Sequence, residues 1–415
     1  MKSKSSCMKP DVKKLPKAVV HVVPSLDVSY GGPAVSVPSL AAALDRRGIR
    51  GILVSIDANP LNALIESTTL PWLKARPGPI KKGYYSPNLT SMISAAVQEI
   101  EADTIHVHTV WGYPLVAAHR VARKTGCRLV VSPRSELYVE SMRKSRLLKA
   151  LVWPLGISAA LAKANLLHAT ESREESAISS LGLPSPVATA ANGIDLSISE
   201  KLIDRHTACE SIGIDPQRYW VLFLSRLHPR KGPDLLIEAW AKAKIYELGW
   251  GCLIAGASDD SRYERQLRDR ASALGLEPSI VWLGHIEGGR KIDTLAASDA
   301  FVLPTQFENF GMSIAEAMAC SLPIITTDQT PWQSIASACA GWIIPANDVN
   351  AIEKALAKMA KTPSEMLRTM GTNAKQLVQP FSWEMAAEQM IVAYGMMSPL
   401  NEQMTKPIRY DARLR

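Results

Sequence analysis

The chain has 415 residues, of which 47% are hydrophobic and 21% are charged, a composition typical of soluble globular proteins. No apolar run reaches the roughly 18 residues that a membrane-spanning helix needs. The six cysteines are scattered, with no CxxC pair, which predicts a reducing compartment and no structural zinc. The length predicts two or three domains.

The net charge of +8 is unevenly distributed. Residues 1–190 hold 24 Lys and Arg against 13 Asp and Glu, whereas residues 191–415 hold 23 against 26. The first half, with a net charge of +11 from these counts, therefore favours an anionic partner, of which nucleic acid and anionic membrane are the common kinds. Aromatic residues make up only 6% and do not alternate with basic ones, so we expect a membrane surface rather than nucleic acid.

Short apolar runs alternate with helical patterns along the whole chain. In the first half, strands are expected at 18–23, 51–56, 104–107 and 128–132, and helices at 33–47 and 113–124. In the second half, strands are expected at 220–224, 251–255, 280–283, 300–303 and 323–327, and helices at 234–243, 263–274 and 313–319. This alternation predicts an α/β fold with two Rossmann-like, doubly wound parallel sheets.

The expected domain boundaries follow from these two series. Residues 1–17 form a flexible basic leader without the apolar core of a signal peptide. A first α/β domain spans 18–190, a linker 191–216, and a second α/β domain 217–380. Residues 381–398 form a C-terminal helix that crosses back to the first domain, and the polar tail 399–415 is expected to be disordered.

Several loops in the first half follow a predicted strand. Gly31-Gly32 opens a helix and permits close approach of a ligand to the backbone. His106 and His108 end a strand with both rings on one side, but no third ligand follows nearby in the sequence, so we expect no metal site. Asn192 begins an Asn-Gly sequence that by itself indicates only a turn.

In the second half, Arg226 and Lys231 follow a strand and supply two positive charges for a diphosphate. Further on, Glu308 and Glu316 stand on either side of Gly311, which opens a helix. Unpaired amides at a helix N-terminus attract phosphate, and carboxylates accept hydrogen bonds from hydroxyl groups. The pattern favours a nucleotide sugar, although a solvated basic turn and ordinary helix carboxylates would look similar.

The chain resembles the retaining glycosyltransferases of family 4, which have the GT-B fold of two Rossmann-like domains facing a deep cleft. The motifs that carry the resemblance occur in the family's order between residues 19 and 394. They are Gly31-Gly32, His108, Ser132-Pro133-Arg134, Asn192-Gly193-Ile194-Asp195, Ser225-Arg226, Lys231-Gly232, Gly284, Glu308 to Glu316, Pro323 and Phe381-Ser382-Trp383.

The resemblance implies an acceptor-binding domain over 18–190, a nucleotide-sugar-binding domain over 217–380, and a role for each matching residue. Arg226 and Lys231 would hold the donor diphosphate, Glu316 the ribose, and Glu308 the donor sugar. His108 and Arg134 would lie on the acceptor side, and the catalytic set would be His108, Glu308, Arg226 and Lys231. The other donor-binding residues would be Gly31, Gly32, Asn192, Gly284, Phe310, Gly311 and Met312.

The implied activity is metal-independent, anomer-retaining transfer from a UDP- or GDP-sugar to a saccharide or lipid-linked saccharide, in the synthesis of bacterial surface polysaccharide such as lipopolysaccharide. No cofactor is expected, and the expected location is the cytoplasm, with peripheral attachment to the inner face of the membrane. An epimerase or phosphorylase of the same fold, and a non-catalytic nucleotide- or membrane-binding protein, remain alternatives.

Two positions depart from the family pattern. Ser321 and Ser135 stand where the family often has glycine, which puts the local loop geometry and the fit of the acceptor in question.

A basic amphipathic segment over residues 138–153 is a candidate membrane contact. Leu147, Leu148, Leu151 and Val152 share one face, while Arg143, Arg146 and Lys149 lie around the other side with Lys144 near the boundary. Such a segment can lie on an anionic membrane. The alternative is that its apolar face packs on the domain core.

Overall fold

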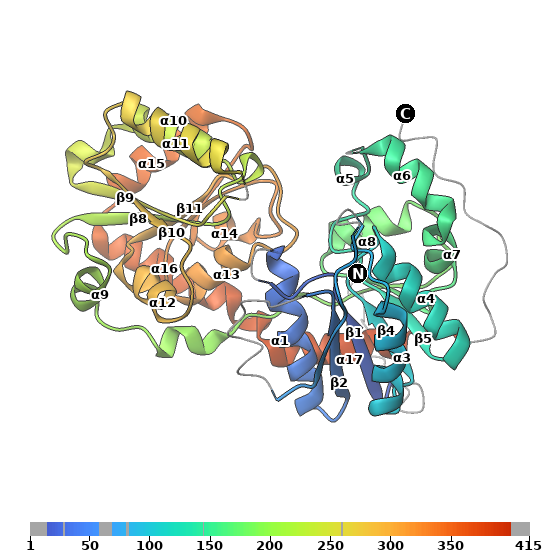
Figure 1. The fold of residues 1–415 in the computed structure, drawn as a ribbon. Coiled ribbons are helices and arrows are strands. Elements are labelled where there is room, and N and C mark those ends of the chain that lie inside the picture. Colours follow the sequence, from blue (N-terminus) through green and yellow to red (C-terminus); the bar gives the residue numbers. More distant parts are fainter. Residues whose placement is uncertain are drawn as a thin grey trace, which may run out of the picture. The chain divides into compact units, whose positions relative to one another are not determined.

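The structure is a computed structural model that describes residues 15–27, 30–57, 69–79, 83–143, 145–258 and 260–399. Most of the expected leader and the expected tail lie outside these residues. The chain forms two compact units (Figure 1). Unit 1 contains residues 1–193 and 383–415, and unit 2 contains residues 194–382.

Unit 1 is built on a parallel seven-stranded sheet with the order β3-β2-β1-β4-β5-β6-β7. Its strands are β1 (Ala18–Val22), β2 (Arg50–Ser55), β3 (Trp72–Lys74), β4 (Thr104–Val107), β5 (Arg128–Val131), β6 (Leu166–Ala169) and β7 (Val187–Thr189). Its helices are α1 (Gly32–Arg46), α3 (Leu89–Glu99), α4 (Tyr113–Thr125), α5 (Val139–Arg143), α6 (Arg146–Val152), η3 (Trp153–Leu155), α7 (Ile157–Ala162), α8 (Ser172–Ser179) and α17 (Trp383–Gly395).

Unit 2 is built on a parallel six-stranded sheet with the order β10-β9-β8-β11-β12-β13. Its strands are β8 (Tyr219–Leu224), β9 (Trp250–Ala255), β10 (Ile280–Gly284), β11 (Ala300–Leu303), β12 (Ile324–Thr327) and β13 (Gly341–Ile344). Its helices are η4 (Leu196–Glu200), α9 (Arg205–Ile212), η5 (Pro229–Lys231), α10 (Pro233–Ala243), η6 (Ile245–Leu248), α11 (Ser261–Ala273), α12 (Gly288–Ala297), α13 (Met312–Ala319), α14 (Ser334–Ser337), α15 (Val349–Ala360), α16 (Ser364–Val378) and η7 (Gln379–Phe381).

The central strands are buried along their whole length. All five residues of β1 and all four of β4 and β11 are buried, which explains why β11 is a continuous apolar run rather than an alternating one. In Figure 1, α10, α11 and α15 lie on one side of the sheet of unit 2, and α12 and α16 lie on the other. The expected fold class, two doubly wound parallel sheets, is confirmed.

Each strand order reverses once, between β1 and β4 in unit 1 and between β8 and β11 in unit 2. In open α/β sheets the loops at the carboxyl ends of the two strands beside such a reversal diverge, and ligands bind in the crevice that they leave. Gly31 and His108 follow β1 and β4, and Lys231 and Glu308 follow β8 and β11. The predicted residues thus lie at the favoured end of the favoured strands in both units.

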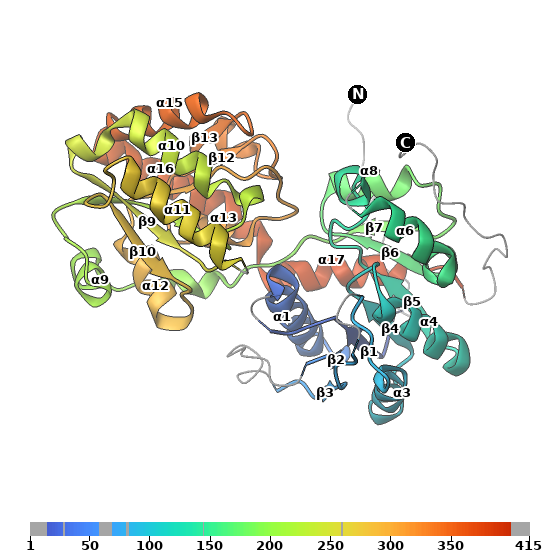
Figure 2. The same ribbon diagram turned by 45° about the horizontal axis from the view of Figure 1, so that its top comes forward.

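The segments at the two domain boundaries, α17 and residues 191–216, are folded parts of the units. The helix α17 belongs to unit 1, where it contacts α1 (Figure 2), and Arg46 and Arg47 of α1 form ion pairs with Glu384 and Glu388 of α17. Most of the segment 191–216, which we expected to be a linker, is folded structure of unit 2. Its helix α9 packs on α12, and Arg205 bonds to Asp299. The expectation was wrong because α9 buries only two of its residues and so shows little apolar periodicity.

Candidate functional site

In unit 2, the two loops that carry the predicted donor residues are tied together by backbone hydrogen bonds. The carbonyl oxygen of Arg230 accepts from the amide of Gln306 at 2.8 Å and from the hydroxyl of Thr305 at 3.0 Å. The next turn needs Gly232, whose φ is +70° and where an added Cβ would lie 2.4 Å from the carbonyl oxygen of Pro304. The loop after β8 is therefore fixed against the loop after β11.

This arrangement brings Lys231 into an ion pair with Glu308. The side chains are 20% and 12% exposed, respectively, so the pair is largely shielded from solvent. Arg226, by contrast, is exposed at the end of β8. The structure thus places the predicted diphosphate and sugar contacts of unit 2 at one strand edge, with one cation already paired to one carboxylate.

The second predicted carboxylate is also paired. Glu316 on α13 accepts a hydrogen bond from Lys291 on α12 at 2.8 Å, and this carboxylate raises the pKa of Lys291. We did not identify Lys291 from the sequence, because it lies 25 positions before its partner and stands in no recognised motif. The only sequence feature near Lys291 that could have indicated it was the Gly288-Gly289 pair, with which α12 begins.

The start of α13 has the geometry expected of an anion-binding turn. Gly311 has a φ of +78° and caps the helix, whose first residue is Met312. The preceding residue, Phe310, is buried, and its carbonyl oxygen accepts from the indole of Trp332 at 2.5 Å. Gly284, at the end of β10, also has a positive φ, +67°. The backbone at 310–312 is thus held in place by the core of unit 2.

In unit 1, Arg134 connects the carboxyl ends of several strands. Its guanidinium donates to the side-chain oxygen of Asn192 at 2.7 Å, to the hydroxyl of Ser36 at 3.2 Å and to Nδ1 of His108 at 3.1 Å. Asn192 follows β7, Ser36 lies on α1, and His108 follows β4. Predicted donor and acceptor residues of unit 1 therefore form one hydrogen-bonded group.

The helix α1 begins beside this group. Gly31 has a φ of +89°, which favours glycine, and it caps α1 without a side-chain hydrogen bond. A Cβ added at Gly32 would meet no atom within 4 Å. Packing within the protein therefore does not require glycine at position 32, and close approach of a ligand would.

His108 is part of a buried histidine cluster. His21 on β1 is the register partner of His106 on β4, and ring nitrogens of His21, His106 and His108 lie within 4.8 Å of one another. We expected no third histidine because none follows nearby in the sequence, and that reason was wrong. The third one lies 85 positions before His106, on the neighbouring strand.

The hydrogen bonds of the cluster oppose cation binding by His108. A guanidinium only donates, so Nδ1 of His108 accepts from Arg134, and a neutral His108 carries its proton on Nε2. That Nε2 lies 3.1 Å from Nδ1 of His21, to which it donates. Both ring nitrogens of His108 are thus occupied, and burial lowers its pKa well below 6.5. A metal-free site remains our prediction.

A carboxylate organises the loop that follows His108. Glu136 accepts hydrogen bonds from the amide groups of Val110 at 2.5 Å and Trp111 at 3.2 Å and from the hydroxyl of Thr109. Burial raises the pKa of Glu136 to about 7, although these hydrogen bonds oppose the shift. Sequence reasoning did not identify Glu136, because its partners are backbone groups that leave no side-chain motif.

The backbone at both departing positions has a conformation that favours glycine. Ser135 and Ser321 have φ values of 70° and 60°, in the left-handed region.

Two parallel sheets, each with polar groups at its reversal point and, in unit 2, a helix N-terminus at that edge, define an α/β protein with two Rossmann-like units. Residues 204–377 match the family described as "Glycosyl transferases group 1", and residues 31–193 match the "Glycosyl transferase 4-like domain". The two matches together cover most of the chain. The chain therefore belongs to the group 1 glycosyltransferases.

Curated relatives carry related names. A D-inositol 3-phosphate glycosyltransferase from Gordonia bronchialis is 28% identical over 69% of this chain and 61% of its own length. The lipopolysaccharide core biosynthesis mannosyltransferase LpsB from Rhizobium meliloti is 26% identical over 50% of this chain and 60% of its own length. The chain thus spans about three fifths of these two relatives.

Solved structures share the fold over nearly the whole chain. HepE from Anabaena in complex with UDP and glucose has a TM-score of 0.74 at 18% identity, covering 90% of this chain and 98% of its own. WaaG, a glycosyltransferase involved in lipopolysaccharide biosynthesis, has a TM-score of 0.68 at 16% identity, covering 90% and 98%. Both show the fold of this chain.

Proposed function

We propose that the chain is a retaining glycosyltransferase that moves a hexose from a nucleotide-diphosphate sugar to a saccharide acceptor. The observation that carries the proposal is the group of charged residues at the reversal point of unit 2, where the exposed Arg226, the Lys231–Glu308 pair and the N-terminus of α13 share one edge of the sheet. The named activities of the relatives and the UDP and glucose in the HepE structure agree with it.

The proposed chemistry uses the protein's own charges. Arg226, Lys231 and the amides at the start of α13 neutralise the departing diphosphate, so that no divalent cation is needed there. Glu316 accepts hydrogen bonds from the ribose and Glu308 from the donor sugar. Without a ligand both carboxylates are paired with lysines, and the proposed chemistry uses neither of them as a nucleophile. The departing phosphate then takes the proton of the attacking acceptor hydroxyl on the same face of the sugar, which retains the configuration.

On the acceptor side, we propose that His108 is a neutral positioning residue, whose hydrogen bonds to Arg134 and His21 hold the loop beside the acceptor in place. Its occupied ring nitrogens and lowered pKa make it a poor general base. Arg134 holds its tautomer. A saccharide or lipid-linked saccharide of a surface polysaccharide, such as lipopolysaccharide, is the acceptor that the relatives' names favour.

The test is donor binding followed by product analysis. Calorimetry with UDP-, GDP- and ADP-sugars identifies the base, and NMR of the product identifies the anomer, in buffer with EDTA. Arg226→Ala should reduce transfer at least 30-fold, because it removes a charge that faces phosphate. Arg230→Ala, an exposed arginine of the same loop, is the matched control and should retain activity. An inverted product, or equal rates for both variants, would refute the proposal, and an epimerised nucleotide sugar would favour the epimerase alternative.

The described residues contain no helix that is long and apolar enough to cross a membrane. We propose a cytoplasmic enzyme that binds the membrane peripherally.

A further inference from the structure

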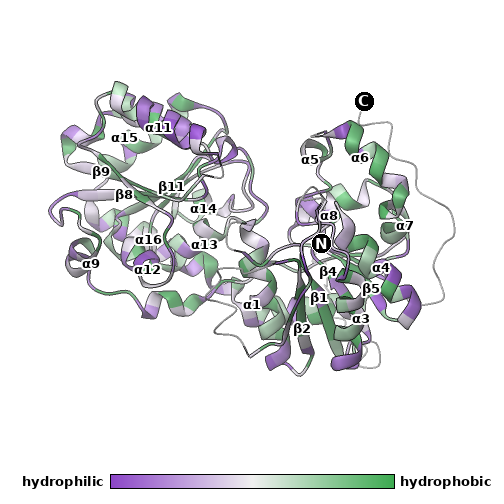
Figure 3. Cartoon of the chain, in the orientation of Figure 1, coloured by the Kyte–Doolittle hydropathy of each residue, from purple (hydrophilic) through white to green (hydrophobic). Residues whose placement is uncertain are grey.

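The helix α6 and the η3 turn after it carry a cluster of solvent-exposed leucines. Leu147, Leu148, Leu151 and Leu155 are 85%, 51%, 67% and 69% exposed, and α6 contains no buried residue. Isolated exposed leucines are common, but four within nine residues form an apolar patch that water alone does not favour. We call these four residues the leucine face. Figure 3 shows α6 carrying hydrophobic residues at the outer edge of unit 1.

The leucine face is not the side by which this segment packs on unit 1. The segment is anchored by Met142 and Trp153, which are 2% and 4% exposed, and the ring of Trp153 lies 5.8 Å from that of Trp111. The alternative raised by the sequence, that the apolar face packs on the domain core, holds for Val152, which lies against the core of unit 1, and is wrong for the leucines. The core contacts are made by other residues, and the leucines face away from them.

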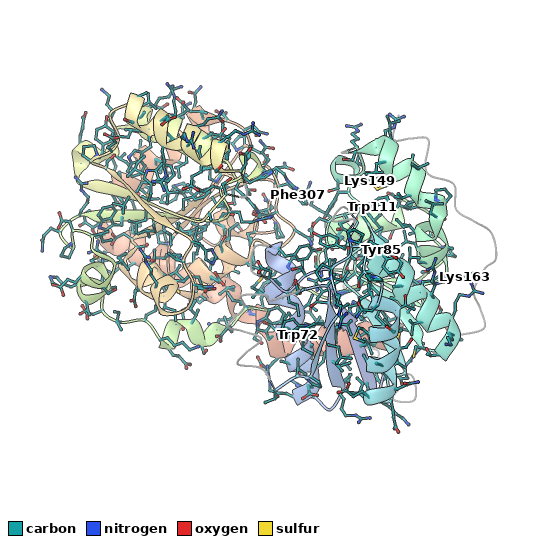
Figure 4. The ribbon with its side chains drawn as sticks, viewed as in Figure 1. Trp72, Tyr85, Trp111, Lys149, Lys163 and Phe307 are labelled. Atoms are coloured by element: carbon teal, nitrogen blue, oxygen red, sulfur yellow. The ribbon has the colours of Figure 1, made fainter. Side chains whose placement is uncertain are left out.

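The charges around the leucine face are basic, with one correction to the sequence prediction. Arg143 and Arg146 are exposed. Lys149, in contrast, points inward, donates to the carbonyl oxygen of Ser141 and lies over the ring of Trp111 at 4.9 Å (Figure 4). Lys144 lies outside the described residues. Arg143 and Arg146 are thus the basic residues that can meet an external anion.

We propose that the leucine face docks onto an anionic lipid bilayer, with its leucines among the acyl chains and Arg143 and Arg146 at the headgroups. An apolar stripe with arginines at its edge matches the layered polarity of such a surface, and residues 1–190 carry the excess positive charge. A second copy of the chain fits less well, because a two-fold symmetric contact would bring the same arginines of both copies together.

The docked segment touches the loop on the acceptor side. Trp111, which packs on Trp153 and Lys149, is three residues after His108, and its amide is held by Glu136. Docking would therefore bring the loop 109–111 close to the lipid surface. Under the proposed function, on which this step rests, the acceptor is a saccharide carried by a lipid of the same membrane.

Vesicle co-sedimentation of the full-length chain tests the docking. Phosphatidylcholine vesicles with phosphatidylglycerol should bind the protein, pure phosphatidylcholine should bind it far less, and salt should weaken binding. Arg143→Gln with Arg146→Gln should weaken binding about 30-fold, since each charge near the surface contributes about fivefold. The paired change Arg120→Gln with Lys124→Gln, exposed residues of α4 in the same unit, is the matched control and should lower binding less.

The leucines are tested in the same way. Leu147→Ser with Leu151→Ser should weaken binding at least tenfold, because these side chains would no longer enter the acyl region. The side chain of Leu248 in unit 2 is 58% exposed, so Leu248→Ser is a matched control that should bind as the wild type does. All these positions are exposed, so the variants should fold, and circular dichroism checks that they do.

Three outcomes overturn the docking. They are equal binding to neutral and anionic vesicles, leucine-face variants that bind like the wild type, and light scattering that shows a dimer which the leucine variants convert to a monomer. The assay needs no substrate, so it is independent of the catalytic proposal. Vesicle binding without any sugar transfer would support the docking and refute the proposed function. Transfer to soluble acceptors without vesicle binding would support the proposed function and refute the docking.

Discussion

Substitution of Lys231 by methionine should destabilise unit 2 as well as reduce donor binding. The lysine is paired with Glu308, whose side chain is only 12% exposed. Exposed ion pairs are worth about 0–1 kcal/mol, but removing one partner of a buried pair costs about 3–5 kcal/mol, because it leaves an uncompensated charge. This pair lies nearer the buried limit, so we expect Lys231→Met to lower the free energy of unfolding by about 2–3 kcal/mol.

The double-mutant cycle isolates the pair itself. Lys231→Met with Glu308→Gln removes both charges, so the double variant should be about 2 kcal/mol more stable than the sum of the two single losses predicts. Urea unfolding of the full-length chain, followed by tryptophan fluorescence, measures these losses. As a control, Arg262→Met removes an arginine whose side chain is 86% exposed in its ion pair with Asp260, and it should have an effect below about 0.5 kcal/mol.

The two single variants should have opposite effects on the affinity for nucleotide. Glu308→Gln frees Lys231 for phosphate and should tighten the binding of UDP or GDP by about fivefold, while Lys231→Met should weaken it by roughly 30-fold or more. Strictly additive losses in the unfolding cycle, together with unchanged nucleotide affinity in both single variants, would refute the reasoning. In that case Lys231 and Glu308 would be neighbours without an energetic coupling.

Three further predictions concern other groups. Acid should destabilise unit 1, because burial lowers the pKa values of His21, His106, His108 and His168 and keeps them neutral in the fold. Below pH 6.5 these histidines bind protons in the unfolded chain but not in the folded one, so the free energy of unfolding decreases as the pH is lowered. His119, whose pKa burial lowers to about 4, adds to the effect, and Glu136, with its raised pKa of about 7, opposes it by about one proton. The free energy of unfolding should therefore decrease as the pH falls below 6.5, which urea unfolding at several pH values measures. A flat profile from pH 7 to 5 would contradict this assignment. Glu316→Ala should weaken UDP or GDP binding about tenfold by calorimetry, because it removes the ribose contact, and an unchanged affinity would exclude that role. Ser321→Gly should raise stability by up to about 1 kcal/mol in thermal unfolding, because it relieves a left-handed backbone at φ 60°, and a loss of stability would show that the serine side chain matters more.

The strands that carry the site were predictable because they are buried on both faces. The expected ranges 104–107 and 300–303 coincide with β4 and β11. The residues of β11 form a continuous apolar run, which leaves little choice of ends, whereas β4 also contains Thr104 and His106. The short strand β3 was not predicted. Its three residues are half-buried or exposed, so no apolar run distinguishes them from a loop.

The candidate site was predictable only where one loop contains its parts. The segment from Glu308 to Glu316 is continuous in sequence, and its turn and helix start formed as expected. Lys291, Glu136 and His21 belong to the same clusters but reach them from other strands or helices. A parallel sheet places the ends of distant strands side by side, and the spacing of residues along the chain does not indicate which strands will be neighbours.

Under the proposed function, the pairing of Lys231 with Glu308 implies that the two parts of the donor bind cooperatively. Without a ligand, Glu308 is occupied by Lys231, so a free sugar would have to compete with a cation for this carboxylate. When a diphosphate takes Lys231, the carboxylate becomes available to the sugar hydroxyl groups. The free sugar of whichever donor binds should therefore bind at least tenfold more tightly to the protein saturated with the matching nucleoside diphosphate than to the protein alone, and calorimetry in the two states measures the ratio. The cooperativity should disappear in Lys231→Met, because in that variant the carboxylate has no cation to release. Equal sugar affinity with and without the nucleoside diphosphate would show that the ion pair does not connect the two halves of the donor.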